Sequence, residues 1–193
     1  MRSICVFCGS NLGADPAFEA AALALGEALG RRGLRLVYGG GRVGLMGVVA
    51  DAALSAGGEV LGVITGALEA KELAHRDLTE LLIVETMHER KAAMADASDC
   101  VVMLPGGFGT FEEFFEAVTW TQLGVHSKPC GILDVNRYFD PLRAVLDHAV
   151  DQRFVRAEHR ALIIDETDPG VLLDKLAAWT PEHLDKWLDR SER

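Results

Sequence analysis

Short apolar runs alternate along the chain with longer segments in which apolar residues recur every three or four positions. The short runs, bounded by Gly, Pro or charged residues, predict strands that are buried on both faces. The longer segments predict helices that cover the strands with one apolar stripe. We expect strands at residues 3–8, 34–38, 59–64, 81–84, 101–104, 129–133 and 162–164. We expect helices at residues 16–32, 45–55, 86–97, from 110 onward, 141–150, 169–179 and 181–193.

This alternation predicts an α/β protein with a mainly parallel sheet of about seven strands and helices on both faces. No linker or repeat divides residues 1–193, so we expect a single domain with a peripheral terminal helix at 181–193. Ligands of such sheets bind beyond the carboxyl ends of the strands, near a topological switch point. We expect four loops to build one site there, with segment 65–79 as a partly helical loop over it: 9–10, 39–44, 86–91 and 105–113.

The stretch Pro105-Gly106-Gly107-Phe108-Gly109-Thr110 predicts a glycine turn that leads into a helix opening on Thr110. Glycines have no Cβ, so the backbone amides of the turn can approach a ligand closely. The unpaired N–H groups and the dipole of the helix start favour an anion. We therefore interpret the turn as a phosphate seat. No G-K-S or G-K-T follows and no lysine is near, which argues against ATP-driven phosphoryl transfer.

A second glycine pattern, Gly39-Gly40-Gly41-Arg42-Val43-Gly44, matches the G-x-G-x-x-G of dinucleotide-binding turns. A dehydrogenase also needs an acidic residue at the carboxyl end of the next strand. Glu59 has about the right spacing but lies at the amino end of its strand, which argues against a dehydrogenase. Two interpretations of the pattern stay open, a ligand-facing turn and a tight turn for close helix packing.

Two cations follow the capping box Thr86-Met87-His88-Glu89. Arg90 and Lys91 fall in the first turn of that helix, where cations oppose the helix dipole. Either these two side chains bind an anion, or they belong to a solvated charged face of the helix.

Glu113 also has two interpretations. Thr110 to Glu113 forms a second T-x-x-E pattern, in which the carboxylate accepts the Thr110 amide. Alternatively, Glu113 takes part in chemistry, because it lies next to the predicted phosphate seat and opposite the apolar stripe of its helix. This stripe consists of Phe111, Phe114, Phe115 and Val118.

The charge and the cysteine content of the chain limit the classes of molecule that it is expected to bind. The 193 residues carry a formal net charge of −10 with a pI near 5.0, which argues against nucleic-acid and membrane-surface binding. Cys5 and Cys8 have C-x-x-C spacing, but on an extended strand they point to opposite faces, and no second pair or His cluster follows. We predict that these cysteines, like Cys100 and Cys130, are buried apolar side chains, with no metal site. The N-terminus lacks the apolar region of a signal peptide, so we predict a cytoplasmic protein.

Three motifs occur together: the segment 39–47 (GGGRVGLMG), the segment 87–91 (MHERK) and the segment 105–113 (PGGFGTFEE). In combination they resemble the LOG (Lonely Guy) family, whose hallmark is P-G-G-x-G-T-x-x-E. The likeness begins at Cys5 and extends through Gly124. It implies a Rossmann-like three-layer sandwich and at least a homodimer, with the site near the subunit interface.

The resemblance implies a cytokinin riboside 5′-monophosphate phosphoribohydrolase, which releases an adenine-type base and ribose 5-phosphate from a nucleoside monophosphate such as AMP. It implies no cofactor. An older family label, lysine decarboxylase, finds no support, because no lysine stands in a recognisable pyridoxal-phosphate setting. The alternative function is a non-catalytic nucleotide or molybdenum-cofactor carrier on the same fold, against which the Arg90 and Glu113 pairing argues.

The resemblance also implies roles for individual residues. Arg90 and Glu113 match the catalytic pair of the family, and Gly107, Gly109 and Thr110 would hold the 5′-phosphate. Lys91, Glu72 and Thr119 fall where family members contact the nucleotide. The other positions expected in the substrate site are Gly9, Ser10, Gly40, Gly41, Gly106, Phe108, Phe111 and Glu112.

Overall fold

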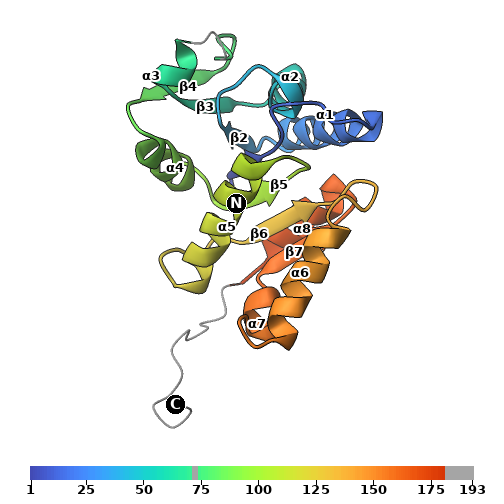
Figure 1. Cartoon of the computed structure of the whole chain (residues 1–193). Helices are drawn as coiled ribbons and strands as arrows, with labels where there is room; N and C mark the ends of the chain where they lie inside the picture. The colour runs from blue at the N-terminus through green and yellow to red at the C-terminus, as the bar shows by residue number, and fades with distance from the viewer. Residues whose placement is uncertain (71–73, 181–193) are drawn as a thin grey trace.

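The structure of the protein is a computed structural model, which describes residues 1–70 and 74–180. Within these residues, seven strands form one sheet in the order β4-β3-β2-β1-β5-β6-β7, and all neighbours are parallel (Figure 1). The predicted parallel sheet is therefore confirmed. The strands are β1 Ser3–Phe7, β2 Arg35–Tyr38, β3 Val60–Thr65, β4 Glu80–Val84, β5 Cys100–Met103, β6 Cys130–Leu133 and β7 Ile163–Glu166.

Helices cover both faces of this sheet and complete three layers (Figure 1). Along β1, Ile4 and Val6 point into a core shared with α1, α2 and α8, whereas Cys5 and Phe7 point into a core shared with α4, α5 and α6. Because strand side chains alternate in direction and both directions are covered, the central strands β1 and β5 are continuous apolar runs, whereas the edge strand β4 is partly exposed. The helices are α1 Pro16–Arg31, α2 Gly44–Ser55, α3 Gly66–Glu69, α4 Met87–Asp96, α5 Phe108–Gln122, α6 Asp140–Asp151, α7 Ala157–Arg160 and α8 Pro169–Ala178.

Local sequence signals set several helix ends as predicted. Asp15 caps α1 by accepting the N–H of Ala17 at 2.9 Å, and Pro16 takes the first position of the helix. α3 accounts for the partly helical character expected in segment 65–79. No pattern predicts α7, because four residues are too few to show a helical period. The helix predicted at 181–193 lies outside the described residues.

The cysteines are free and buried, and Cys5 and Cys8 lie in the two different cores, as strand alternation predicts. Burial raises the pKa of Cys130 to about 12, so this thiol stays protonated and behaves as a small apolar side chain. In the part of the chain that the structure describes, no helix is both long and apolar enough to span a membrane.

The strand order creates a switch point between β1 and β5. The chain builds the sheet outward from β1 to β4 and then returns to place β5 on the other side of β1. Loops that leave neighbouring strands in opposite directions open a crevice at the carboxyl edge of the sheet. Gly9 after β1 and Pro105 after β5 meet there, because the Gly9 N–H donates to the Pro105 carbonyl at 3.0 Å.

Candidate active site

The four loops that were expected to share a site lie together at this edge. Gly9 and Pro105 join the first loop to the last. Gly44, with φ +61°, packs so closely on Ser10 that a side chain there would overlap the Ser10 backbone. Gly39 packs in the same way against the guanidinium of Arg90. Loops far apart in the sequence meet because a parallel sheet brings the carboxyl ends of all its strands to one edge.

The start of α5 differs from the prediction. The helix begins at Phe108 with Gly107 as its N-cap, and no side chain caps it. Thr110 is therefore the third helical residue, and it is buried against Gly106. The capping box between Thr110 and Glu113, one of the two interpretations of Glu113, does not form. The glycines at 106 and 107 allow the backbone to enter the helix within the turn itself, three residues earlier than a cap at Thr110 would.

A matching pattern behaves as predicted at Thr86. Its hydroxyl accepts the N–H of Glu89 at 3.1 Å, and the Glu89 carboxylate accepts the Thr86 N–H at 3.2 Å. Glu89 is thus a capping residue of α4, whereas Glu113 is free for another partner.

The start of α5 is open. Phe108 is 95% exposed, and a Cβ at Gly107 or Gly109 would touch nothing within 4 Å. The first N–H groups of a helix have no intrahelical acceptor, and the helix dipole adds partial positive charge beside them. The geometry suits a phosphate. The phosphate seat itself stays a prediction.

Arg90 of α4 and Glu113 of α5 form a buried ion pair. Arg90 Nη1 lies 2.7 Å from Glu113 Oε1, and the two side chains are 8% and 13% exposed. Arg90 Nε donates to the Val63 carbonyl at 2.9 Å, and Nη2 lies against Gly39. The guanidinium thus fits between the ends of β2 and β3 and presents its remaining edge to Glu113. A solvated charged face, the other interpretation of Arg90 and Lys91, is wrong.

Burial dominates the electrostatics of Glu113. It raises the pKa of the carboxyl group, and the neighbouring Arg90 lowers that pKa in part. Glu113 lies on the side of α5 opposite the aromatic stripe, a side that would face solvent in an isolated amphipathic helix. Here α4 covers it, because Arg90 of α4 forms an ion pair with Glu113. A buried carboxyl group whose pKa is shifted by burial and by a specific charged partner is a candidate for acid–base chemistry.

Lys91 is paired as well. Its Nζ lies 2.6 Å from Glu112 Oε1 and 3.0 Å from Glu116 Oε1. The hydrogen bonds that Lys91 donates to Glu112 and Glu116 raise the pKa of Lys91, and burial lowers it in part. Glu116 was missed by sequence reasoning, although its position one turn after Glu112 places both carboxylates on one face of α5. The anions that Arg90 and Lys91 hold here are therefore carboxylates of α5.

The turn 39–44 is largely occupied by contacts within the protein. The Gly40 carbonyl accepts the His75 N–H at 2.8 Å, and Gly41 forms a β-bridge with Ala74. Together with the close approach at Gly44, these contacts favour the tight-packing interpretation of the glycine pattern over a ligand-facing one. They also place residues 74 and 75 over the site edge, as expected for segment 65–79.

The side chains of two other predicted residues, Thr119 and Phe111, contact groups outside the glycine turn. Thr119 lies about three turns into α5, where its hydroxyl donates to the Phe115 carbonyl at 2.7 Å. Phe111 packs edge to face on Phe139 in the core, with ring centroids 6.5 Å apart. Glu72 lies outside the described residues.

A cavity of about 280 Å³ lies beside the glycine turn. Tyr138, which no motif singles out, forms part of its wall and donates a hydrogen bond to the Gly106 carbonyl at 2.6 Å. A larger hollow of about 690 Å³ lies at the amino-terminal edge of the sheet, around Glu59. Glu59 is thus at the edge where parallel sheets do not bind their ligands, as predicted.

Gly39→Ala is expected to lower kcat for a substrate of this site about 10²-fold. The added Cβ would overlap Arg90 Nη2 and displace the guanidinium from its position beside Glu113. Turnover and the thermal melting curve should be compared with those of Gly66→Ala. Gly66 lies at the end of neighbouring β3, and a Cβ there meets only Ile83 at 4.0 Å. Full turnover by a well-folded Gly39→Ala would show that the placement of Arg90 is unimportant.

A parallel sheet that reverses its strand order beside an open helix start places the protein in the Rossmann-like class of α/β proteins. The molybdenum cofactor binding protein from Rippkaea orientalis shares this fold, with a TM-score of 0.70 and 19% sequence identity, over 92% of this chain and 97% of that chain.

Closer relatives identify the family. The family model described as possible lysine decarboxylase matches residues 46–176. The probable cytokinin riboside 5′-monophosphate phosphoribohydrolase LOGL1 of Oryza sativa subsp. japonica is 49% identical over 180 residues, which cover 93% of this chain and 81% of that protein. The cytokinin riboside 5′-monophosphate phosphoribohydrolase LOG2 of Arabidopsis thaliana is 44% identical over 184 residues, covering 95% and 86%. The chain belongs to this LOG family, as its motifs predict.

Proposed function

We propose that this chain hydrolyses the N-glycosidic bond of a nucleoside 5′-monophosphate and releases the free base and ribose 5-phosphate. The observation that carries the proposal is the buried Arg90–Glu113 pair, 2.7 Å apart, beside the open start of α5. The names of the relatives, cytokinin riboside 5′-monophosphate phosphoribohydrolases, support the same reaction. The substrates proposed are AMP and its N6-prenylated derivatives.

In this proposal the 5′-phosphate binds the free N–H groups of Gly107, Gly109 and Thr110. Its binding energy, gained away from the reacting atoms, is used to hold C1′ of the ribose near Glu113. The glycosidic bond breaks with its electron pair leaving on the base, and positive charge develops on the ribose. The Glu113 carboxylate stabilises that charge and takes a proton from the attacking water, whose oxygen bonds to C1′. The departing base takes a proton from solvent, and Glu113 then returns its proton to solvent, so that the net reaction consumes one water.

Arg90 acts through Glu113 in this scheme. One edge of the guanidinium is bonded to the Val63 carbonyl and another to Glu113, so that two of its three nitrogens are held by the protein. A cation in this position opposes the effect of burial and keeps more of Glu113 ionised. Arg90 is therefore proposed as a positioning residue for the carboxylate.

The test is incubation with AMP and with isopentenyladenosine monophosphate, followed by chromatography of the free base and an assay for ribose 5-phosphate. Both products are expected in equal amounts, and adenosine, which lacks the phosphate, should react far more slowly. Folded protein that releases base from neither monophosphate would refute the proposal. Tight binding of an unhydrolysed ligand in calorimetry would instead favour the carrier function.

We also propose a homodimer. β4 is an edge strand, and apolar side chains are exposed on it and just after it, namely Leu82, Ile83 and Met87. An unpaired strand edge with apolar side chains exposed beside it can pair with another chain, and a second copy is the partner proposed. Sedimentation velocity tests this, since a monomer of 20.9 kDa would contradict it. The cytoplasmic location stays a prediction.

A further inference from the structure

Tyr138 reaches the glycine turn from the loop between β6 and α6. Its hydroxyl donates a hydrogen bond to the Gly106 carbonyl at 2.6 Å. Its ring packs edge to face on Phe18 and on Phe139, with ring centroids 5.6 and 4.9 Å away. These ring contacts restrict the direction of the hydroxyl, so the bond to Gly106 comes from a side chain that is itself held in place.

We propose that Tyr138 is a positioning residue of the phosphate seat, whose hydroxyl aims the Gly107 amide at the substrate phosphate. This rests on the proposed function, which places the phosphate at the start of α5. The Gly106 carbonyl and the Gly107 N–H belong to one trans peptide and point in opposite directions. Holding the carbonyl toward Tyr138 therefore turns the N–H toward the far side of the turn. The hydrogen bond also polarises the peptide and makes its N–H a better donor.

The turn needs such a restraint because glycine has more conformational freedom than any other residue. On one side, the Gly9 N–H holds the Pro105 carbonyl at 3.0 Å. Within the turn, the Thr110 side chain packs on Gly106 and leaves no room for a Cβ. Tyr138 supplies the restraint on the carbonyl of Gly106 itself. Its loss would free the peptide that carries the Gly107 N–H.

The loop that carries Tyr138 is strained. Asn136 and Arg137 have φ angles of 49° and 60°, in the left-handed region that residues with a side chain rarely adopt. Such conformations persist where the surroundings over-determine them, and they concentrate at functional sites. Asn136 Nδ2 donates to Asp15 at 2.8 Å, and Arg137 Nε donates to Asp140 at 2.6 Å, so both strained residues are held by their side chains.

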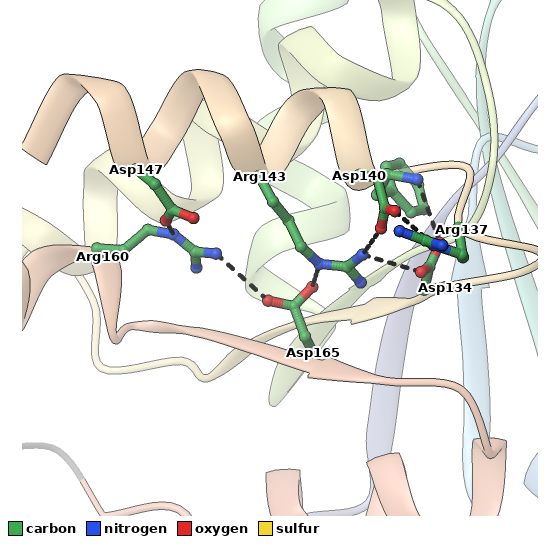
Figure 2. A network of polar contacts seen from close by, with 8 residues as sticks. Asp134, Arg137, Asp140, Arg143, Asp147, Arg160 and Asp165 are labelled. Carbon is green, nitrogen blue, oxygen red and sulfur yellow. Dashed lines mark hydrogen bonds and ion pairs between the residues drawn. The ribbon is translucent and has the colours of Figure 1, made fainter.

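A network of carboxylates and arginines fastens this loop to the sheet (Figure 2). Asp134, which directly follows β6 and is buried, accepts the Phe139 N–H at 3.2 Å and Arg143 Nη1 at 2.9 Å. Arg143 also donates to Asp165 of β7 at 3.1 Å. The two ends of the loop are thus joined to one another and to β7. These contacts hold the loop in place, and with it Tyr138, whose hydroxyl contacts the glycine turn.

Tyr138→Phe tests the proposal, because it removes the hydroxyl and keeps the ring. We expect KM for AMP and the calorimetric dissociation constant of ribose 5-phosphate to rise about fivefold, as for the loss of one hydrogen bond, with kcat nearly unchanged. The matched control is Tyr38→Phe. Tyr38 is buried at the end of β2, and its hydroxyl has no hydrogen-bond partner among the described residues. This control should leave both constants unchanged.

The outcomes separate this inference from the proposed function. If the wild type hydrolyses AMP and both constants stay unchanged in Tyr138→Phe, the inference fails and the proposed function stands. Equal losses in the two variants, or a loss of kcat alone, would also overturn it, since they indicate a general effect on folding. If the wild type hydrolyses no monophosphate, the proposed function fails. Calorimetry with AMP then decides the inference: binding that is weaker only in Tyr138→Phe supports it, and equal or absent binding overturns it.

Discussion

Glu113→Gln is expected to lower kcat for AMP by about 10²–10⁴-fold, while the protein still folds. The amide oxygen can still accept the hydrogen bond of Arg90, which now lies 2.7 Å from Oε1, so the contact between α4 and α5 persists. The amide cannot take a proton from water and carries no charge to stabilise an oxocarbenium ion. Turnover should be measured together with the melting temperature. The control is Glu27→Gln, which removes the charge of a partly exposed glutamate that is paired with Arg31.

The pH dependence of the wild type gives a second measurement on the same group. Burial raises the pKa of Glu113, so kcat should fall on the acid side at a pH above the usual range of a glutamate. The raised pKa favours folding at low pH, and this contribution is lost as the pH rises through the pKa of the folded state. If Glu113→Gln keeps its turnover and only has a lower melting temperature, Glu113 is a structural ion-pair partner and not a catalytic residue.

Arg90→Met is expected to lower both activity and stability, because it leaves Glu113 buried without its cation. Removing one partner of a buried pair costs about 3 kcal/mol of unfolding free energy. The pKa of Glu113 should rise further, so the acid limb of the rate profile moves to higher pH. The destabilisation should be smallest at low pH, where the carboxyl group is protonated, and should grow as the pH rises. Denaturant titrations at several pH values measure it.

Two further variants make this result specific. Arg31→Met removes an arginine whose side chain is 70% exposed and paired with Glu27, and it should cost less than about 1 kcal/mol. The double variant of Arg90→Met with Glu113→Gln should regain stability relative to Arg90→Met alone, without regaining activity. A double variant no more stable than Arg90→Met would show that the loss comes from packing around Val63 and Gly39, where the guanidinium also lies.

Local patterns were sufficient for most of the fold. The apolar runs predict the strands because a parallel sheet buries both faces, and the Asp15-Pro16 and Thr86 signals predict helix starts because the capping groups are neighbours in sequence. The meeting of the four loops follows from the parallel topology alone.

The same kind of pattern failed at Thr110. It repeats the T-x-x-E of Thr86, yet α5 begins at Phe108. A cap forms only where the chain enters the helix, and the glycines before Phe108 allow an earlier entry that the pattern does not reveal. The proposed catalytic role of Glu113 therefore rests on its observed ion pair with Arg90, not on the local sequence pattern.

The sequence by itself determined most of the elements, the parallel sheet, the edge at which the candidate site residues gather, and the family. Only the tertiary structure decided the partners of charged and polar groups that lie far apart in the sequence. Arg90 and Glu113 are 23 positions apart, and Tyr138 and Gly106 are 32 apart. With 29 acidic residues in the chain, many carboxylates could pair with Arg90 on sequence grounds. The position of α4 beside α5 selects Glu113 as the partner of Arg90, and the loop after β6 brings Tyr138 to Gly106. Contacts of this kind depend on where whole elements lie, which local sequence patterns do not show.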